Sequence, residues 1–301
     1  MKRALIAVLF AAVSAAHACE VRSVTMVPLI LRGGHALVDA RIDHRPVRLI
    51  LDSGAERSLL TPAAVRRLGL KLDPWVGSTN IGIGGEEHHA NALVPRLTLN
   101  GIPLRQVFPL PELSLSVGAL PGAAGAGRRV AGLLGRDILA RYDLDIDMPR
   151  RRITLFRVHG CSGRFLPWWG PYRRAAMLPG YRPVLGLAAR ADGRELRAMI
   201  DTGATGQLLS AAGMARLGLT VGGLSGAPVV RARGVGPRTV IGRFLTLRRL
   251  TVAGVGARDV PVMATPVILT PILDLLIGMN WLIDHRVWLS YATGQVFVAG
   301  R

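Results

Sequence analysis

Two short segments of the chain share one pattern, an apolar run that ends in an aspartate, a hydroxyl residue and a glycine. They occupy residues 49–55 and 198–204, and their aspartates, Asp52 and Asp201, are 201 − 52 = 149 residues apart. A fold that brings the two turns together would hold two carboxylates face to face, where they cannot both ionise easily and would share a proton. The ionised carboxylate could then take a proton from a bound water while the protonated one polarises a carbonyl group. That is the acid–base chemistry needed to hydrolyse an amide.

The residues that follow each aspartate are suited to support such a pair. Gly54 and Gly203 allow a tight turn that brings backbone N–H groups close to the carboxylate. Ser53 and Thr202 can donate hydrogen bonds to the opposite loop and so hold the two carboxylates in register. We therefore predict that these four residues support the pair.

The repetition extends well beyond the two turns. An apolar pair followed by glycine recurs later in each copy, 135 − 52 = 83 residues after the first aspartate and 278 − 201 = 77 residues after the second. Between the turn and this glycine, each copy also has a short apolar run and a helical pattern. Self-similarity over this length indicates a duplicated unit. The matching segments are 58–61, 63–70 and 133–139 in the first copy, and 208–210, 213–219 and 276–282 in the second.

Strand patterns dominate both copies, with short runs of Val, Leu and Ile broken by Gly, Pro and Asp-Gly turns. One predicted hairpin leads into each aspartate, and another closes each copy. The resulting fold class is mostly β, with two pseudo-symmetric lobes, short helices and a cleft between the lobes. The predicted pairs are 36–42 with 47–51, 143–147 with 153–156, 184–189 with 196–200, and 287–291 with 296–299.

The chain divides into four parts by composition. Residues 1–18 have a basic start, an apolar stretch and a small-x-small end, which predicts an export signal rather than a membrane anchor. Residues 19–156 form the first lobe, 157–182 a Gly- and Pro-rich connector with two packed tryptophans, and 183–301 the second lobe. Residues 110–129, rich in Pro, Gly and Ala, predict a surface loop. The expected location is therefore periplasmic or extracellular.

Cys19 and Cys161 are the only cysteines. Export to an oxidising compartment would permit a disulfide between them, and two free thiols are the alternative. Cys19 follows the predicted cleavage site, so lipid attachment there is a second alternative. It is disfavoured because Ala16 stands where a lipid-attachment sequence has an aliphatic residue.

The formal net charge of +19 comes almost entirely from arginine. The arginines are scattered and aromatic residues are few, so we expect a solvated basic surface and no specific nucleic-acid site. Glu86, Glu87, His88 and His89 are adjacent on a predicted strand, where neighbours point to opposite faces, so we expect no metal site. Asp137, Asp143, Asp145 and Asp147 are expected to be structural or surface charges, with no counterpart pair in the second copy.

The two Asp-(Ser/Thr)-Gly-Ala motifs, each followed by two apolar residues and glycine, resemble the lobes of the aspartic peptidase clan to which retroviral proteases and pepsin belong. The chain is most similar to exported bacterial proteins with two retropepsin-like domains. The resemblance implies no cofactor and a β-hairpin flap over the cleft, although no flap tyrosine of the pepsin type is present. The candidate flap residues are Ile81, Gly82, Ile83, Gly84 and Gly85 in the first lobe, and Gly234, Val235 and Gly236 in the second.

The sequence therefore predicts an aspartic endopeptidase that acts on peptide or protein substrates through a water between Asp52 and Asp201. Pairing of the two lobes within one chain favours an active monomer over a dimer of chains. The alternative function is a catalytically silent module that binds peptides or cell-wall strands on the same fold. Ala55 and Ala204 stand where pepsin-like enzymes have a hydroxyl residue, so we expect activity at mildly acidic to neutral pH.

Overall fold

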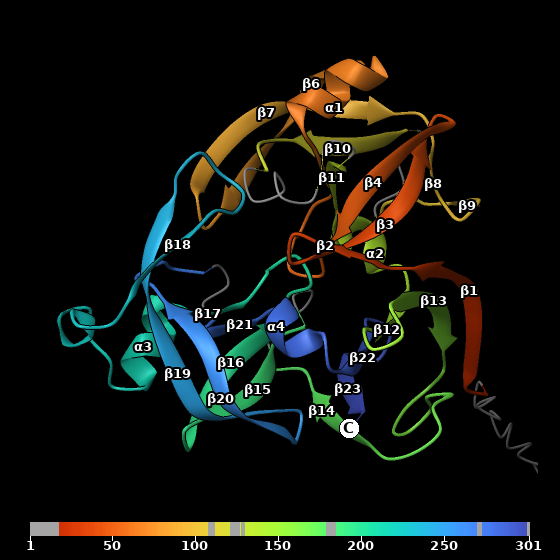
Figure 1. Cartoon of the computed structure of the whole chain (residues 1–301). Helices are drawn as coiled ribbons and strands as arrows, with labels where there is room; N and C mark the ends of the chain where they lie inside the picture. Colours follow the sequence, from red (N-terminus) through yellow and green to blue (C-terminus); the bar gives the residue numbers. More distant parts are fainter. Residues whose placement is uncertain are drawn as a thin grey trace, which may run out of the picture.

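The strands of the computed structural model form three sheets, one in each lobe and one shared by both lobes (Figure 1). The structure describes residues 18–107, 112–120, 127, 130–178, 185–269 and 273–299. The predicted export signal, apart from residue 18, lies outside them. Within these ranges no helix is long and apolar enough to cross a membrane.

The first lobe is built on a ten-stranded sheet. The hairpin of β3 and β4 leads into Asp52, as predicted, and pairs Leu37 with Ile50. In spatial order the strands are β6 (Leu72–Gly82), β7 (Gly85–Val94), β10 (Leu113–Val117), β5 (Leu59–Leu60), β11 (Val130–Leu134), β4 (Arg45–Leu51), β3 (His35–Ile42), β8 (Leu97–Leu99) and β9 (Ile102–Pro103), with β2 (Ile30–Arg32) paired to β3.

The second lobe repeats this plan in a seven-stranded sheet. The hairpin of β15 and β16 leads into Asp201 and pairs Leu187 with Ala198. In spatial order the strands are β15 (Leu187–Ala191), β16 (Arg194–Ile200), β21 (Leu275–Ile277), β17 (Gln207–Leu209), β20 (Val255–Ala264), β19 (Val240–Val252) and β18 (Val229–Ala232).

Short helices form within or next to the segments for which the sequence predicts helix. Helix α1 (Pro62–Leu68) begins at Thr61, whose hydroxyl accepts a hydrogen bond from the Ala64 amide, and ends at Gly69, where φ is 62°. Proline at the first turn, a hydroxyl cap and a left-handed glycine are the usual helix boundaries. The other helices are α2 (Arg136–Leu139), α3 (Ala211–Arg216), α4 (Met279–Leu282) and the 3-10 turn η2 (Gly222–Leu224).

The third sheet joins the lobes, and the sequence did not predict it. Its order is β1 (Glu20–Pro28), β13 (Arg152–His159), β12 (Asp143–Asp147), β22 (Arg286–Ser290), β23 (Gln295–Ala299) and β14 (Tyr172–Ala176). The two closing hairpins form as expected, but β12 and β22 also pair with each other in antiparallel fashion across the lobes. Figure 1 shows this sheet on the side of the molecule away from β7 and β18.

The connector contributes to this shared sheet. Strand β13 runs past the predicted lobe end to His159, and β14 lies inside the predicted connector. Trp168 is buried and stacks edge-on against Trp288, whereas Trp169 is fully exposed, so the expectation that both tryptophans pack was wrong for Trp169. A disulfide joins Cys19 to Cys161 and fastens β1 to the end of β13.

The predicted surface loop at 110–129 contains a strand instead. Strand β10 is buried along its whole length and lies between β7 and β5, so the loop prediction was wrong there. Most of the rest of the predicted loop lies outside the described residues.

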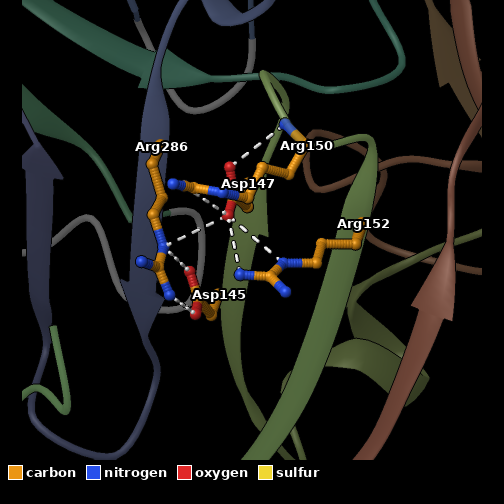
Figure 2. Close-up of polar contacts among 5 residues, drawn as sticks. All are labelled: Asp145, Asp147, Arg150, Arg152 and Arg286. Atoms are coloured by element: carbon orange, nitrogen blue, oxygen red, sulfur yellow. Dashed lines mark hydrogen bonds and ion pairs between the residues drawn. The ribbon is translucent and has the colours of Figure 1, made fainter. Parts of the chain in front are cut away.

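Buried ion pairs tie the two lobes together within the shared sheet. Arg286 of β22 donates two hydrogen bonds to Asp145 of β12, at 2.9 and 2.6 Å, and its guanidinium lies 4.6 Å from the ring centre of Trp168. Asp147, whose side chain is 1% exposed, accepts from Arg150 and Arg152. Figure 2 shows Arg286 reaching Asp145 and Asp147 from the opposite strand. Both aspartates are structural, as the sequence predicted.

We expect Arg286→Met to lower the free energy of unfolding by about 3 kcal/mol, because it leaves the Asp145 carboxylate buried without its bidentate partner. Urea denaturation measures the change. Arg150→Met is the matched control: its side chain is 66% exposed and Asp147 keeps other partners, so the loss should stay below about 1 kcal/mol. Equal losses in the two variants would contradict the assignment of Arg286 as the interlobe link.

Candidate active site

The two Asp-(Ser/Thr)-Gly turns lie at equivalent places in the two lobes, directly after β4 and β16. The Asp52 amide donates to the carbonyl of Leu134 and the Asp201 amide to that of Ile277, both at 3.0 Å. Strand β11 runs parallel to β4, and β21 runs parallel to β16. The later apolar-apolar-glycine segment of each repeat is therefore the neighbour that holds the aspartate at its strand end.

Hydrogen bonds between the two turns connect the lobes in a buried setting. Thr202 Oγ1 donates to the carbonyl of Leu51 at 2.8 Å and accepts from the Ser53 amide at 2.9 Å. Ser53 Oγ donates to the carbonyl of Ile200 at 2.8 Å and accepts from the Thr202 amide at 3.2 Å. Ser53 and Thr202 are 2% and 0% exposed. The relative position of the two turns is therefore fixed by reciprocal bonds between hydroxyls and backbone groups.

The carboxylates of Asp52 and Asp201 lie against each other. Asp52 Oδ1 accepts from the amides of Gly54 and Ala55 at 3.0 and 2.8 Å. Asp201 Oδ1 accepts from the two equivalent amides of its own turn at 2.9 and 3.1 Å. A methyl group on Gly54 would overlap the Asp201 carboxylate, and one on Gly203 would overlap that of Asp52. Glycine at these two positions is what allows the close approach.

Burial raises the pKa of both carboxyl groups. For Asp52, burial and then the neighbouring Asp201 raise the pKa well above its ordinary value. For Asp201, burial raises the pKa, while the amides of Gly203 and Ala204 and the positive charge of His35 oppose the rise. Both carboxyl groups therefore hold a proton more firmly than a free aspartate does, and the two titrate as a pair.

An apolar cluster lies beside the dyad in each lobe. The first cluster adjoins Ala55, the residue after the Asp52 turn, and the second includes Met199, two residues before Asp201. The first cluster comprises Leu37, Ile50, Leu59, Val130 and Leu133; the second comprises Met199, Leu208, Leu273 and Leu276.

The two candidate flaps are hairpin tips that contact each other. The β6–β7 tip and the segment between β18 and β19 meet through backbone bonds, from the Gly84 amide to Val235 and from the Arg238 amide to Gly84, at 3.0 and 2.9 Å. A Cβ atom on Gly84 would lie 2.9 Å from three carbonyl oxygens of the opposite segment, so only glycine permits this contact. Figure 1 shows β18 reaching towards β7.

Each flap tip also packs against the apolar cluster of the other lobe. Ile83, from the first lobe, packs on the second apolar cluster, and Val235, from the second lobe, packs on the first cluster. Ile81, in contrast, is 71% exposed. Of the other candidate flap residues, Gly82 and Gly85 flank the β6–β7 turn, and Gly234 and Gly236 flank Val235.

The remaining polar candidates lie apart from the dyad. Asp137 accepts from the amide and hydroxyl of Ser58 at 2.8 and 2.6 Å, which braces the turn after Asp52. Asp143 is buried and accepts from Trp288 and Ser290 of the other lobe.

His88, His89 and Glu87 of the first flap make side-chain contacts with other residues. His88 lies 3.0 Å from Thr79 Oγ1, and His89 pairs with Glu87 at 3.3 Å. Across the part of the chain that the structure describes, no three His, Cys, Asp or Glu side chains gather as metal ligands.

Sequence reasoning missed His35, which lies next to the dyad. Its Nδ1 is 3.1 Å from the carbonyl oxygen of Gly203, although the two residues are 168 positions apart. A single histidine in a strand pattern carries no signal of such a contact. Buried Arg136 and half-buried Tyr291 were also missed; desolvation raises the pKa of Tyr291, with Asp52 among the charges that act on it.

The comparisons with known proteins agree with this geometry. The aspartyl protease family matches the chain twice, over residues 38–138 and 187–281, which is more than half of its length. The chain therefore belongs to the aspartyl protease family, and its two tandem lobes confirm the predicted fold class and relationship. Among solved structures, it is similar to the aspartic proteinase from Irpex lacteus, with a TM-score of 0.52 and 12% identity over 91% of this chain and 96% of that chain. This likeness supports the fold. A search of curated proteins gave no match.

Thr202→Val should lower the free energy of unfolding by about 2–4 kcal/mol, because it leaves the Leu51 carbonyl and the Ser53 amide buried without their partner. Thr202→Ser retains the hydroxyl and should lose much less. Urea denaturation of both variants tests this, and similar losses would contradict a role for the hydroxyl in joining the turns.

Asp52→Asn should make the protein more stable than wild type at neutral pH. The folded-state pKa of this carboxyl is raised, so its ionisation opposes folding as the pH rises above the ordinary Asp value near 3.9. The gain should shrink as the pH falls towards that value, because the wild-type carboxyl is then protonated in both states.

Thermal unfolding across the pH range measures this difference. Asp39→Asn, at a side chain that is 66% exposed, is the control and should show no such pH-dependent gain. A wild-type protein that is more stable than Asp52→Asn at neutral pH would contradict the prediction.

Proposed function

We propose that this protein is an aspartic endopeptidase in which Asp52 and Asp201 are the catalytic residues. The observation that carries the proposal is the contact between two carboxylates from two lobes, each oriented by two backbone amides of its own turn. A site of this kind can bind one water molecule between the carboxylates and needs no covalent intermediate.

In the proposed reaction, Asp201 acts as the base and Asp52 as the acid. Asp201 removes a proton from the water, and the water oxygen attacks the carbonyl carbon of the peptide bond. Asp52 donates its proton to the carbonyl oxygen, which gives a tetrahedral diol. Asp201 then gives its proton to the amide nitrogen while Asp52 takes a proton from one diol hydroxyl. The C–N bond breaks, and the acid and amine products leave with the dyad back in its singly protonated state. The positive charge of His35, which acts on Asp201 and favours its ionised form, supports this assignment.

We propose an extended peptide with apolar side chains on both sides of the cleaved bond as the substrate. The two apolar clusters flank the dyad from opposite lobes, and the flap tips lie over them as Ile83 and Val235. The flaps would have to separate for a peptide to enter. Because one chain supplies both carboxylates, a monomer would suffice for activity.

We further propose that the protein is exported by the signal at residues 1–18, to the periplasm or the exterior. The Cys19–Cys161 disulfide supports this, because such bonds persist in oxidising compartments. The bond also occupies the sulfur that a lipid would need, which favours a protein without a lipid anchor. We retain 19–156, 157–182 and 183–301 as the lobe and connector boundaries, with strands of all three entering the shared sheet.

Asp52→Asn and Asp201→Asn should each reduce peptide hydrolysis by at least about 10²–10⁴-fold, because each removes one partner of the acid–base pair. The measurement is cleavage of a peptide library by the mature protein, followed by mass spectrometry between about pH 3 and about pH 8. We expect wild-type activity at mildly acidic to neutral pH.

Asp39→Asn, remote from the dyad, serves as the control and should keep its activity. A wild-type protein that binds peptides but cleaves none at any of these pH values would instead support the silent binding module. Near-full activity in either dyad variant would contradict the proposed mechanism.

A further inference from the structure

His35 reaches from one lobe to the catalytic turn of the other. It begins β3 of the first lobe, is 7% exposed, and places its Nδ1 3.1 Å from the carbonyl oxygen of Gly203. A carbonyl oxygen can only accept, so the hydrogen bond requires a proton on Nδ1. The turn before it fits closely against the same loop, since a Cβ on Gly34 would meet the Thr205 side chain at 3.0 Å. The imidazole is therefore held in place beside Asp201.

The two halves of the dyad are otherwise closely matched. Each carboxylate accepts from the two amides that follow it, and each turn carries one hydroxyl that bonds across to the other lobe. His35 is a difference between the two halves, because the second repeat has no histidine at the matching position. It stands 52 − 35 = 17 residues before Asp52, and the residue 201 − 17 = 184 at the same distance before Asp201 is Val184, which cannot carry a charge.

The two carboxyl groups have different charged and polar neighbours. The groups that face Asp201 are the Asp52 carboxyl, its own turn amides and the positive charge of His35. The pKa of Asp52 is affected by Asp201 and by the amides of its own turn. Arg32 lies opposite His35 in the β2–β3 ladder, and its side chain is exposed.

We infer that His35 is a positioning residue that makes the dyad asymmetric: it anchors the Asp201 turn through Gly203 and, when protonated, favours the ionised form of Asp201. This inference rests on the proposed peptidase function. The shared proton then resides on Asp52, so each carboxyl has one role when the water is bound.

The sign of the pH effect follows from the charge. At low pH the pair of carboxyl groups takes up a second proton, on Asp201, and activity is lost. A positive charge next to Asp201 shifts this loss to lower pH.

Three variants test the inference. His35→Asn keeps an N–H donor near the Nδ1 position but is uncharged at every pH, and His35→Arg keeps a permanent positive charge. His44→Asn is the matched control, because His44 lies in the exposed β3–β4 turn with φ at 68°, which asparagine tolerates.

The first measurement is the pH profile of kcat/KM. In His35→Asn the acid limb should move up by at least about half a pH unit, a roughly threefold loss at a pH on that limb relative to its own optimum. His35→Arg should keep the acid limb at or below that of wild type, and His44→Asn should superimpose on wild type. An unchanged limb in His35→Asn, or the same upward shift in His35→Arg, would overturn the inference.

The second measurement does not depend on activity. Carboxyl ¹³C NMR of protein labelled at aspartate, with Asp201→Asn to assign the signal, follows protonation of Asp201 directly. We expect Asp201 in His35→Asn to take up its proton at higher pH than in wild type, and an unchanged titration would overturn the inference. If the titration shifts but the wild-type protein cleaves no peptide, the inference about His35 stands and the proposed function fails.

Discussion

The fold depends on holding two carboxylates against each other away from water, which both burial and like charge oppose. The reciprocal bonds of Ser53 and Thr202 meet this demand, because each hydroxyl binds a backbone carbonyl of the opposite turn and accepts from its amide. Separating the turns would break all four of these hydrogen bonds, and an unpaired buried polar group costs more free energy than a typical hydrogen bond contributes. The unfavourable proximity of Asp52 and Asp201 is thus sustained by neighbours that carry no charge.

The shared sheet provides the framework in which those short bonds can form. Strands β12 and β22 give the lobes a common backbone ladder, and Arg286 neutralises Asp145 inside it. The disulfide secures the outer strand of the same sheet. At the opposite side, the flap tips exchange apolar partners through Ile83 and Val235. The dyad therefore lies between two interlobe contacts of different kinds, one rigid and one made of a few bonds between loops.

The sequence was most informative where structure is local or repeated. The hairpins into Asp52 and Asp201, and the helix capped by Thr61, follow from alternation, turn residues and capping within a few positions. The pairing of β12 with β22 joins residues that are 286 − 147 = 139 to 289 − 144 = 145 positions apart, and no local sequence pattern predicts it. Strand β10 was missed because Pro and Gly on either side dominate the composition. His35 was missed for a related reason: its importance comes from a turn in the other lobe.

Both Asp-(Ser/Thr)-Gly turns lie in one polypeptide, so the two sides of the site need not be identical. In a dimer of identical lobes, any substitution appears on both sides, and a peptide could lie across the site in either of two orientations. Here the two copies differ at matching sequence positions, with His35, Ser53 and Asp137 in the first copy where the second has Val184, Thr202 and Asn280. Under the proposed function, the two sides of the site therefore differ chemically, and a bound peptide would have one preferred orientation.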